Sequence, residues 1–308
     1  MHIGNYLGAF KPFLDLAKWK KAYIFIADYH SLTSVHDGET LKNNKLRLLK
    51  EYFALLPEDT DIVVYEQSKV KRINDITWIL SSVTPYSMML RAHSFKDSQN
   101  KNSDINMSVF NYPILMTSDI IAYDTDIVPV WKDQIQHLEF ARDIAWNFNK
   151  TYKTDLFKLP EHHVEAELQT IPWTDWRKMS KSYDNFIWIF DSKKVLKKKI
   201  MSIVTDTKEL EEPKDPETCN VFALIKLFAS KDKQDEIAAK YRAWNYGYGH
   251  AKLELLDIIL EYFKEARERF ESFENDMSYI EKKLEEWNNE ANELATNKYN
   301  EMMKTVWL

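Results

Sequence analysis

Hydrophobic residues in the first part of the chain alternate between short buried runs and the 3.6-residue spacing of amphipathic helices. We expect a loop over residues 2–9 that leads into a helix, because the apolar positions from Leu7 to Ala17 recur at helical spacing. Two buried strands and two further helices are expected at 23–27, 61–65, 40–56 and 73–82. Strand, helix, strand, helix in this order predicts a doubly wound α/β fold with a parallel sheet.

The same alternation continues to about residue 190 and then stops. A polar loop, a helix containing Pro113, a strand, a helix, a mixed loop and a last strand are expected at 94–106, 105–123, 127–130, 133–149, 150–176 and 187–190. Beyond that point only helical periodicity remains, over 193–204, 219–230, 234–242 and two long charged helices within 250–305. We therefore predict a Rossmann-type α/β domain over 1–190 and an all-helical domain over 191–308.

Composition narrows the class of protein. The 308 residues are 44% hydrophobic, and no apolar run approaches the roughly 18 residues of a membrane span, so we expect a cytoplasmic protein with no membrane partner. The single Cys219 excludes a disulfide framework. His162 and His163 have no ligand partner at metal spacing, so we expect a loop there and no metal site. With a net charge of -6, a nucleic-acid partner would need a local basic patch.

Two short motifs carry the candidate chemistry. Lys178 and Lys181 are three positions apart, with Ser180 between them and Ser182 directly after them. Ammonium groups and hydroxyls suit a polyphosphate, although a solvated basic turn uses the same residue types. Near the start, His2-Ile-Gly-Asn precedes a helix, and the free N–H groups at a helix N-terminus bind anions. Both motifs therefore predict phosphate binding.

These motifs resemble the KMSKS and HIGH signatures of class I aminoacyl-tRNA synthetases, the second in its HIGN form. The segments 112–123 and 128–143 are similar to the pattern YPxLMAxDI…VPVGxDQxQHxExARD of the tryptophanyl-tRNA synthetase family, and residues 26–33 match the same family. The tyrosyl relative shares the two signatures and a DQ element but lacks the LMxxDI…VPV block. The resemblance covers residues 2–308 and favours tryptophan.

The resemblance implies a tryptophan–tRNA ligase. The carboxylate of L-tryptophan attacks the α-phosphorus of ATP to give tryptophanyl-adenylate, and the aminoacyl group then passes to tRNA(Trp). Catalysis of this kind depends on positioning and charge stabilisation, and Mg²⁺ arrives with ATP without a protein cage. By the resemblance, the catalytic residues are His2, Asn5, Lys178, Lys181 and Ser182. The implied ATP-binding set is Gly4, Asn5, Trp131, Lys132, Asp133, Thr170, Ile171, Lys178, Met179, Ser180, Lys181 and Ser182.

Choice of tryptophan requires an acceptor for the indole N–H, which only donates. Asp119 is the family's candidate, because a carboxylate facing an apolar slot rejects phenylalanine, which would leave the charge unpaired. The alternative for Asp119 is a carboxylate on a helix surface. By the resemblance, the slot is completed by Tyr112, Met116, Gln134, Val128, Val130 and His30. Met116 and the valines also suit a plain core, His30 also suits a satisfied strand-end histidine, and His137 suits a structural role.

Further expectations come from the family, and alternatives stay open. The family implies a helical domain that reads the anticodon, and a homodimer. One alternative is an inactive synthetase paralogue or truncated fragment that binds tryptophan or RNA. Another is a tyrosyl-type synthetase. Amino-acid-dependent exchange between ATP and pyrophosphate, measured with tryptophan and with tyrosine, separates the three.

Two features depart from the family pattern. The family has a strand and a PTG-type turn before HIGN, whereas one residue precedes His2 here. We therefore expect a sheet that lacks its first strand, and a truncated or mis-started sequence. Tryptophan also stands at glycine positions of the family, at 131, 173 and 176, and Trp146, Trp244 and Trp307 look similar.

The chain contains fewer glycines than average, which agrees with tryptophan at glycine positions of the family. The chain has 5 Gly and 10 Trp, against an average glycine usage of about 7%. An indole cannot adopt a positive φ cheaply or let ATP approach the backbone. We interpret the pattern as a gene that uses UGA for glycine, translated with UGA read as tryptophan. Trp78 matches a tryptophan of the family, whereas the sequence leaves Trp19, Trp188 and Trp287 undecided.

Overall fold

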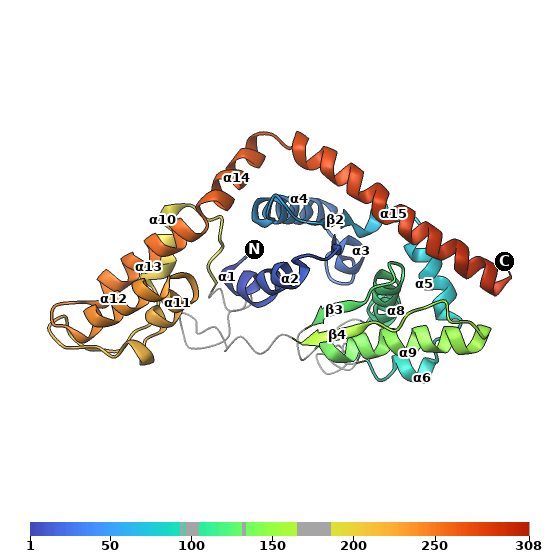
Figure 1. Cartoon of the computed structure of the whole chain (residues 1–308), viewed down its shortest axis with the longest axis horizontal. Coiled ribbons are helices and arrows are strands. Elements are labelled where there is room, and N and C mark those ends of the chain that lie inside the picture. Colours follow the sequence, from blue (N-terminus) through green and yellow to red (C-terminus); the bar gives the residue numbers. More distant parts are fainter. Residues whose placement is uncertain (93–94, 96–104, 131–133, 165–185, 308) are drawn as a thin grey trace. The chain divides into compact units, whose positions relative to one another are not determined.

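Two parallel strands, β1 (Ala22–Ile26) and β2 (Ile62–Glu66), lie where the apolar runs predict them (Figure 1). The computed structural model describes residues 1–92, 95, 105–130, 134–164 and 186–307. Tyr23 pairs with Val63 and Phe25 with Tyr65. A second parallel pair joins β3 (Ile127–Val130) to β4 (Glu161–Val164). The predicted α/β class with parallel strands is confirmed, with the described strands arranged as two small sheets.

Helices make up most of the rest of the described chain. The helical elements are α1 (Ile3–Asn5), the π-helical turn η1 (Tyr6–Phe10), α2 (Lys11–Ala17), α3 (Asp28–Ser31), α4 (Gly38–Leu55), the 3₁₀ turn η2 (Gln67–Lys69), α5 (Ile73–Ser81), α6 (Tyr86–Met89), α8 (Met107–Ile121), α9 (Ile135–Tyr152), α10 (Lys193–Met201), the 3₁₀ turn η5 (Pro216–Thr218), α11 (Asn220–Phe228), α12 (Lys231–Arg242), α13 (Tyr248–Tyr262), α14 (Lys264–Asn275) and α15 (Ser278–Val306). The helices predicted between residues 40 and 242 are confirmed, with shifted ends.

Two expectations near the HIGN motif are wrong. Residues 2–9 were expected as a loop, but helix begins at Ile3 because the Nδ1 atom of His2 accepts a hydrogen bond from the Asn5 N–H at 3.2 Å. Such a side-chain cap satisfies one of the free N–H groups of the first turn. The strand expected at 187–190 is an isolated antiparallel bridge between His2 and Trp188.

Two further expectations are wrong later in the chain. His162 and His163 were assigned to a loop, but they lie in β4, whose first residue donates its N–H to the Asp126 carbonyl at 2.9 Å. The two long helices expected within 250–305 are three. The break between α14 and α15 falls at Asp276, whose backbone is extended.

The chain forms two compact units. The HIGN unit comprises Met1–Leu16, Lys50–Leu56 and Glu167–Asp276. The sheet unit comprises Ala17–Leu49, Pro57–Ala166 and Met277–Leu308. Each unit therefore draws residues from both sides of position 190.

In the sheet unit, the core lies where β2, α5, α8, α9 and α15 meet (Figure 1). Tyr65, Ile76, Ile144 and Phe148 are among its fully buried side chains. The helix α15 also completes the hydrogen bonding of β2. The Oδ1 atom of Asn288 accepts from the Glu66 N–H at 2.8 Å, and its Nδ2 atom donates to Oε2 of Glu66 at 3.0 Å. The last helix of the chain thus satisfies a backbone group of an early strand.

In the HIGN unit, the first residues of the chain pack against a segment far along the sequence. The Ile3 N–H donates to the Ile187 carbonyl at 3.0 Å, and the Ile189 N–H donates to the Met1 carbonyl at 3.2 Å. Tyr6 lies edge-on against Phe263, with ring centroids 4.9 Å apart. Farther on, α10 and α11 both pack on α13. The contacts of Ile3 and Tyr6 hold the helical segment that starts at Ile3 in a defined place within its unit.

Candidate active site

The side chain of Asp119 is a buried carboxylate of the sheet unit with specific hydrogen-bond partners. It is 1% exposed, and its Oδ2 atom lies 2.9 Å from Nε2 of His30 and accepts a hydrogen bond from Nε2 of Gln67 at 2.7 Å. Its other oxygen, Oδ1, is buried and has no hydrogen-bond partner among the described residues. A buried acceptor without a partner is costly in free energy, so Oδ1 is suited to a donor that a ligand brings.

The partners of Asp119 come from the ends of the two neighbouring strands β1 and β2. His30 lies in α3, which follows β1, and Gln67 begins the turn that follows β2. Parallel strands place their carboxyl ends at the same edge of a sheet, which is where open α/β sheets bind ligands. The turn is secured by Asp28, whose Oδ1 atom accepts from the Ser68 N–H at 2.9 Å. The strand order therefore brings His30 and Gln67 to one carboxylate.

Aromatic and imidazole rings extend this network. The ring of Tyr112 lies edge-on to His30, with centroids 6.1 Å apart. The Tyr112 hydroxyl and Nε2 of His137 are 3.0 Å apart. Tyr112, Met116 and Asp119 follow the spacing that places residues on one side of a helix. The side of α8 that carries Asp119 thus continues into a half-buried aromatic surface.

Burial shifts the proton equilibrium of Asp119. Desolvation raises the pKa of this carboxyl above its ordinary value of 3.8, while His30 and Gln67 oppose the shift. A group that is buried and also held by specific partners is typical of a functional site.

The structure brings together three of the seven residues predicted to bind tryptophan: Asp119, His30 and Tyr112. Met116, Val128, Val130 and Gln134 are half-buried on α8, on β3 and at the N-cap of α9, and their place in the slot stays a prediction. Ten predicted ATP-binding residues lie outside the described residues: Trp131, Lys132, Asp133, Thr170, Ile171, Lys178, Met179, Ser180, Lys181 and Ser182. Trp173 and Trp176 also lie outside them.

The HIGN motif lies in the HIGN unit, at the start of a helical segment that runs from Ile3 through η1 to Ala17. His2 is buried and caps this segment, Gly4 is half-buried and Asn5 is exposed. The π-helical turn that follows is a rare conformation that is frequent at functional sites. The motif thus presents the first turn of a helix, where N–H groups and the helix dipole favour an anion.

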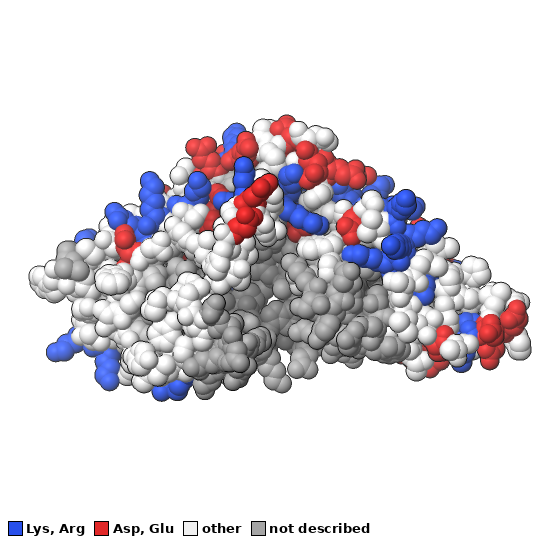
Figure 2. Space-filling model, turned by 180° about the vertical axis from the view of Figure 1, so that it is seen from behind, with Lys and Arg blue, Asp and Glu red and all other residues white. Residues whose placement is uncertain are grey.

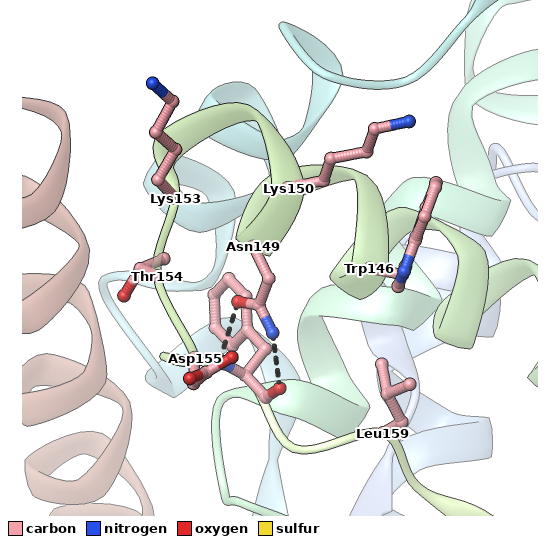
Figure 3. Close-up of a pocket in the computed structure, with 8 residues that line it drawn as sticks. Trp146, Asn149, Lys150, Lys153, Thr154, Asp155 and Leu159 are labelled. Carbon is pink, nitrogen blue, oxygen red and sulfur yellow. Dashed lines mark hydrogen bonds between the residues drawn. The ribbon is translucent and has the colours of Figure 1, made fainter.

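A separate pocket of 490 Å³ lies at the C-terminal end of α9 in the sheet unit (Figure 3). Asn149 shapes it, because its side chain donates to the Phe157 carbonyl at 2.8 Å and accepts from the Phe157 N–H at 3.0 Å (Figure 3). Trp146 forms part of the wall, with the ammonium group of Lys150 4.6 Å from its ring centroid. The lining includes none of the predicted site residues, so we regard this pocket as a feature of the turn after α9 and not as part of the candidate active site.

Two residues of the network are not among the predicted site residues. Gln67 is completely buried and donates to Asp119, and its position two residues after a predicted strand is the available signal. His137 contacts Tyr112, and its structural role stays a prediction. Within the described ranges, no three His, Cys, Asp or Glu side chains gather as a possible metal site. None of the described helices has the length and apolarity needed to cross a membrane.

Comparison with known proteins places the chain in a family. The sequence profile of the tRNA synthetases class I (W and Y) matches residues 1–264. A tryptophan–tRNA ligase from Fusobacterium nucleatum is 46% identical over 308 residues, which is 100% of this chain and 94% of the relative. The crystal structure of a tryptophanyl-tRNA synthetase from Campylobacter jejuni, complexed with ADP and tryptophan, is 42% identical, with a TM-score of 0.95 over 100% of this chain and 96% of that one.

The chain therefore belongs to the class I aminoacyl-tRNA synthetases of the tryptophan and tyrosine type. Within that class it is a member of the tryptophanyl-tRNA synthetase family. The predicted family, the fold class and the enzyme class, an aminoacyl-tRNA ligase, are confirmed.

The raised pKa of Asp119 predicts how the stability of the protein depends on pH. The folded protein binds this proton more tightly than the unfolded chain, so the contribution of the carboxyl is full below its ordinary pKa of 3.8 and is lost as the pH rises through the folded value. Relative to an Asp119→Asn variant, the wild type should lose about 1.4 kcal/mol of unfolding free energy per unit of pKa shift. Urea unfolding at a series of pH values measures the unfolding free energy of the wild type minus that of the variant. If this value stays constant or rises with pH, the prediction is contradicted.

Proposed function

We propose that this chain activates L-tryptophan with ATP to tryptophanyl-adenylate and transfers the aminoacyl group to tRNA(Trp). The observation that carries the proposal is the buried Oδ1 atom of Asp119, an acceptor without a partner among the described residues. The indole N–H is a donor that accepts nothing in return, so it matches an acceptor-only carboxylate oxygen. The Campylobacter jejuni relative in complex with ADP and tryptophan supports both small-molecule substrates.

Specificity for tryptophan in this proposal comes from the free-energy cost of leaving a buried hydrogen-bond acceptor without a donor. Phenylalanine has no donor on its ring, so binding it would leave the Asp119 oxygen buried and unpaired. His30 contacts the carboxylate, and Tyr112 lies edge-on to His30. Met116, Val128, Val130 and Gln134 complete the slot and contact the rest of the indole. Gln67 and His30 hold Oδ2, which leaves Oδ1 for the ligand.

The remaining site residues act on ATP. His2, Gly4 and Asn5 meet the phosphates at the helix start, and Asp133, with Trp131 and Lys132 beside it, meets the ribose. The backbone at Thr170 and Ile171 meets adenine. Lys178, Met179, Ser180, Lys181 and Ser182 contact the pyrophosphate side. Mg²⁺ would arrive with ATP and would supply positive charge to the phosphates.

The reaction needs no nucleophile from the protein. The tryptophan carboxylate attacks the α-phosphorus, the bond from that phosphorus to the bridging oxygen breaks, and pyrophosphate leaves. The lysines and the helix N-terminus stabilise the charge that develops on the leaving group. In the second step, a ribose hydroxyl of tRNA(Trp) attacks the adenylate carbonyl and AMP leaves. We place both steps in a cytoplasmic protein whose residues 1–190 hold the catalytic site and whose residues 191–308 meet the anticodon.

The function is tested by tryptophan-dependent exchange between ATP and pyrophosphate. An Asp119→Ala variant should raise the KM for tryptophan about 10- to 150-fold, because a hydrogen bond to a charged group contributes about 1.5–3 kcal/mol. The KM for ATP should change little. Thr117→Val is the matched control, because Thr117 is buried on the same helix and its hydroxyl donates only to the Pro113 carbonyl, at 2.8 Å.

Three results would contradict this assignment. Exchange with tyrosine in place of tryptophan would indicate a tyrosyl-type enzyme. If exchange is absent both in the chain and in a variant carrying Trp131→Gly, Trp173→Gly and Trp176→Gly, the protein is an inactive paralogue. An equal loss in Asp119→Ala and Thr117→Val would show that Asp119 acts through the packing of α8 alone.

The expected homodimer has a candidate surface in the sheet unit. Trp78 on α5, Tyr86 on α6 and Met107 on α8 are 80%, 70% and 67% exposed. Both α5 and α6 pack on α8, and Tyr86 lies against Phe110 with ring centroids 5.9 Å apart. Aromatic residues and methionine are enriched in protein interfaces, and a two-fold dimer pairs the same patch on both copies. A second copy of this chain is therefore the partner that we propose for this surface.

A Trp78→Glu variant should shift the protein from dimer to monomer, because two carboxylates would be buried in one interface. Sedimentation velocity at micromolar concentration measures the change. Trp244→Glu is the control, because Trp244 is 71% exposed and lies in the HIGN unit. A wild type that sediments as a monomer, or a Trp78→Glu variant that stays dimeric, would contradict the prediction.

A further inference from the structure

The helix α10 (Lys193–Met201) carries five lysines in nine residues. Its N-cap is Ser192, and Leu196 and Ile200 are buried. Lys193, Lys194, Lys197 and Lys198 are exposed around this apolar side. Figure 2 shows lysine and arginine side chains gathered where α10 lies. In a chain with a net charge of -6, this is a local basic patch.

The stability of α10 favours a lysine only in its last turn, where Lys198 lies, and does not explain the lysines of its first turn. Lys193 and Lys194 occupy the first turn, where the helix dipole disfavours positive charge. Lys193 and Lys197, and likewise Lys194 and Lys198, are four residues apart, a spacing at which like charges destabilise a helix. The sequence thus places positive charge where it costs helix stability.

Carboxylates do not offset this charge among the described residues. Lys199 is the α10 lysine with a described ion pair, 3.6 Å from Asp191, and the four exposed lysines have none. The helix α12 of the same unit behaves differently. Lys231 lies 2.9 Å from Asp235, Lys233 lies 3.0 Å from Glu236, and Lys240 lies 2.7 Å from the same glutamate. The charge of α12 is therefore largely balanced, whereas that of α10 is open to an external anion.

We propose that α10 contacts the phosphate backbone of tRNA through Lys193, Lys194, Lys197 and Lys198. This inference rests on the proposed function, which makes tRNA the polyanion that the protein must hold. Lysines bind phosphates as mobile point charges, and each contact releases counterions from the nucleic acid. The gain in tRNA affinity offsets the cost that the like charges impose on the helix.

The test compares two assays on a variant that combines Lys193→Gln, Lys194→Gln, Lys197→Gln and Lys198→Gln. Exchange between ATP and pyrophosphate uses no tRNA and should stay within twofold of the wild type. The Kd for a tRNA(Trp) transcript should rise at least about tenfold near 0.15 M salt, and the slope of log K against log salt should become shallower by about 3. The KM for tRNA in aminoacylation should rise in parallel.

A Lys231→Gln, Lys233→Gln variant of α12 is the control and should bind tRNA as the wild type does. Unchanged tRNA affinity and an unchanged salt slope in the α10 variant would overturn the inference, as would an equal loss in the α12 variant. Absence of exchange in both the wild type and the variant carrying Trp131→Gly, Trp173→Gly and Trp176→Gly would instead contradict the proposed function, so the two failures are distinguishable.

The backbone conformation of two tryptophans carries a separate inference. Among the described residues, five that are not glycine have a positive φ: Trp19, Asp124, Lys153, Asn245 and Trp307. Asn and Asp tolerate this region, whereas it is strained for a bulky residue. Trp19 has φ 65° and is fully exposed, and Trp307 has φ 60° and is 93% exposed. Neither indole therefore gains packing that would offset the strain.

Trp307 also occupies a position that glycine favours for a structural reason. It follows α15 in the left-handed conformation and donates its N–H to the Met303 carbonyl, which is the usual glycine arrangement at the end of a helix. Trp188 and Trp287 differ, because Trp188 packs against His2 and Phe186 and Trp287 packs against the core of the sheet unit. We infer that positions 19 and 307 are glycine in the natural protein, encoded by UGA, and that positions 188 and 287 are tryptophan.

Peptide masses of the protein from its native source, read together with the codons, test this inference. We expect UGA codons and glycine masses at 19 and 307, with UGG codons and tryptophan masses at 188 and 287. UGG codons or tryptophan masses at 19 and 307 would overturn the inference. Glycine masses at 188 and 287 would overturn it as well, because they would show that backbone conformation and packing do not separate the two groups.

Discussion

The sheet unit is organised around a carboxylate that water does not reach. A buried carboxylate is costly unless donors replace its hydration, and Asp119 obtains them from Gln67 and His30 at 2.7 and 2.9 Å. These donors follow different strands, so the parallel pairing of β1 with β2 is required to bring them together. Because Tyr112 and Asp119 both contact His30, the rotation of α8 about its axis is set as well. Satisfying only one carboxylate oxygen leaves the other available for recognition.

The same need to satisfy buried polar groups joins the two ends of the sheet unit. The strand β2 is buried along its whole length, and α15 comes from the end of the sequence to cover it. Asn288 bonds both the backbone and the side chain of Glu66, and Asn292 accepts from the Lys71 N–H at 2.9 Å. The sequence of α15 has the amphipathic pattern of a solvated helix, but α15 is part of the core that supports Asp119.

Lysine serves two opposite purposes in this chain. Lys298 is 8% exposed at its side chain and lies between Asp124 and Glu301, and Lys45 lies 2.6 Å from Glu66. Such partly buried ammonium groups need carboxylates close by, because they have lost most of their hydration. The four exposed lysines of α10 remain hydrated, and their like charges repel one another. Local charge balance, rather than net charge, distinguishes a structural lysine from one available to a polyanion.

The sequence by itself determined the parallel α/β class, most helix positions and the family, and it identified Asp119 as a candidate, because hydrophobic periodicity and short motifs can be recognised without coordinates. It did not determine that Gln67 shares Asp119 with His30, that His2 caps its own helix, or that α15 packs on β2, because these depend on contacts between residues far apart in the chain or on a cap geometry. The left-handed backbone at Trp19 and Trp307 was equally invisible, since φ depends on how the chain must turn to reach its packed state. Only the tertiary structure decides which buried polar groups meet a partner, and it leaves Oδ1 of Asp119 without one among the described residues.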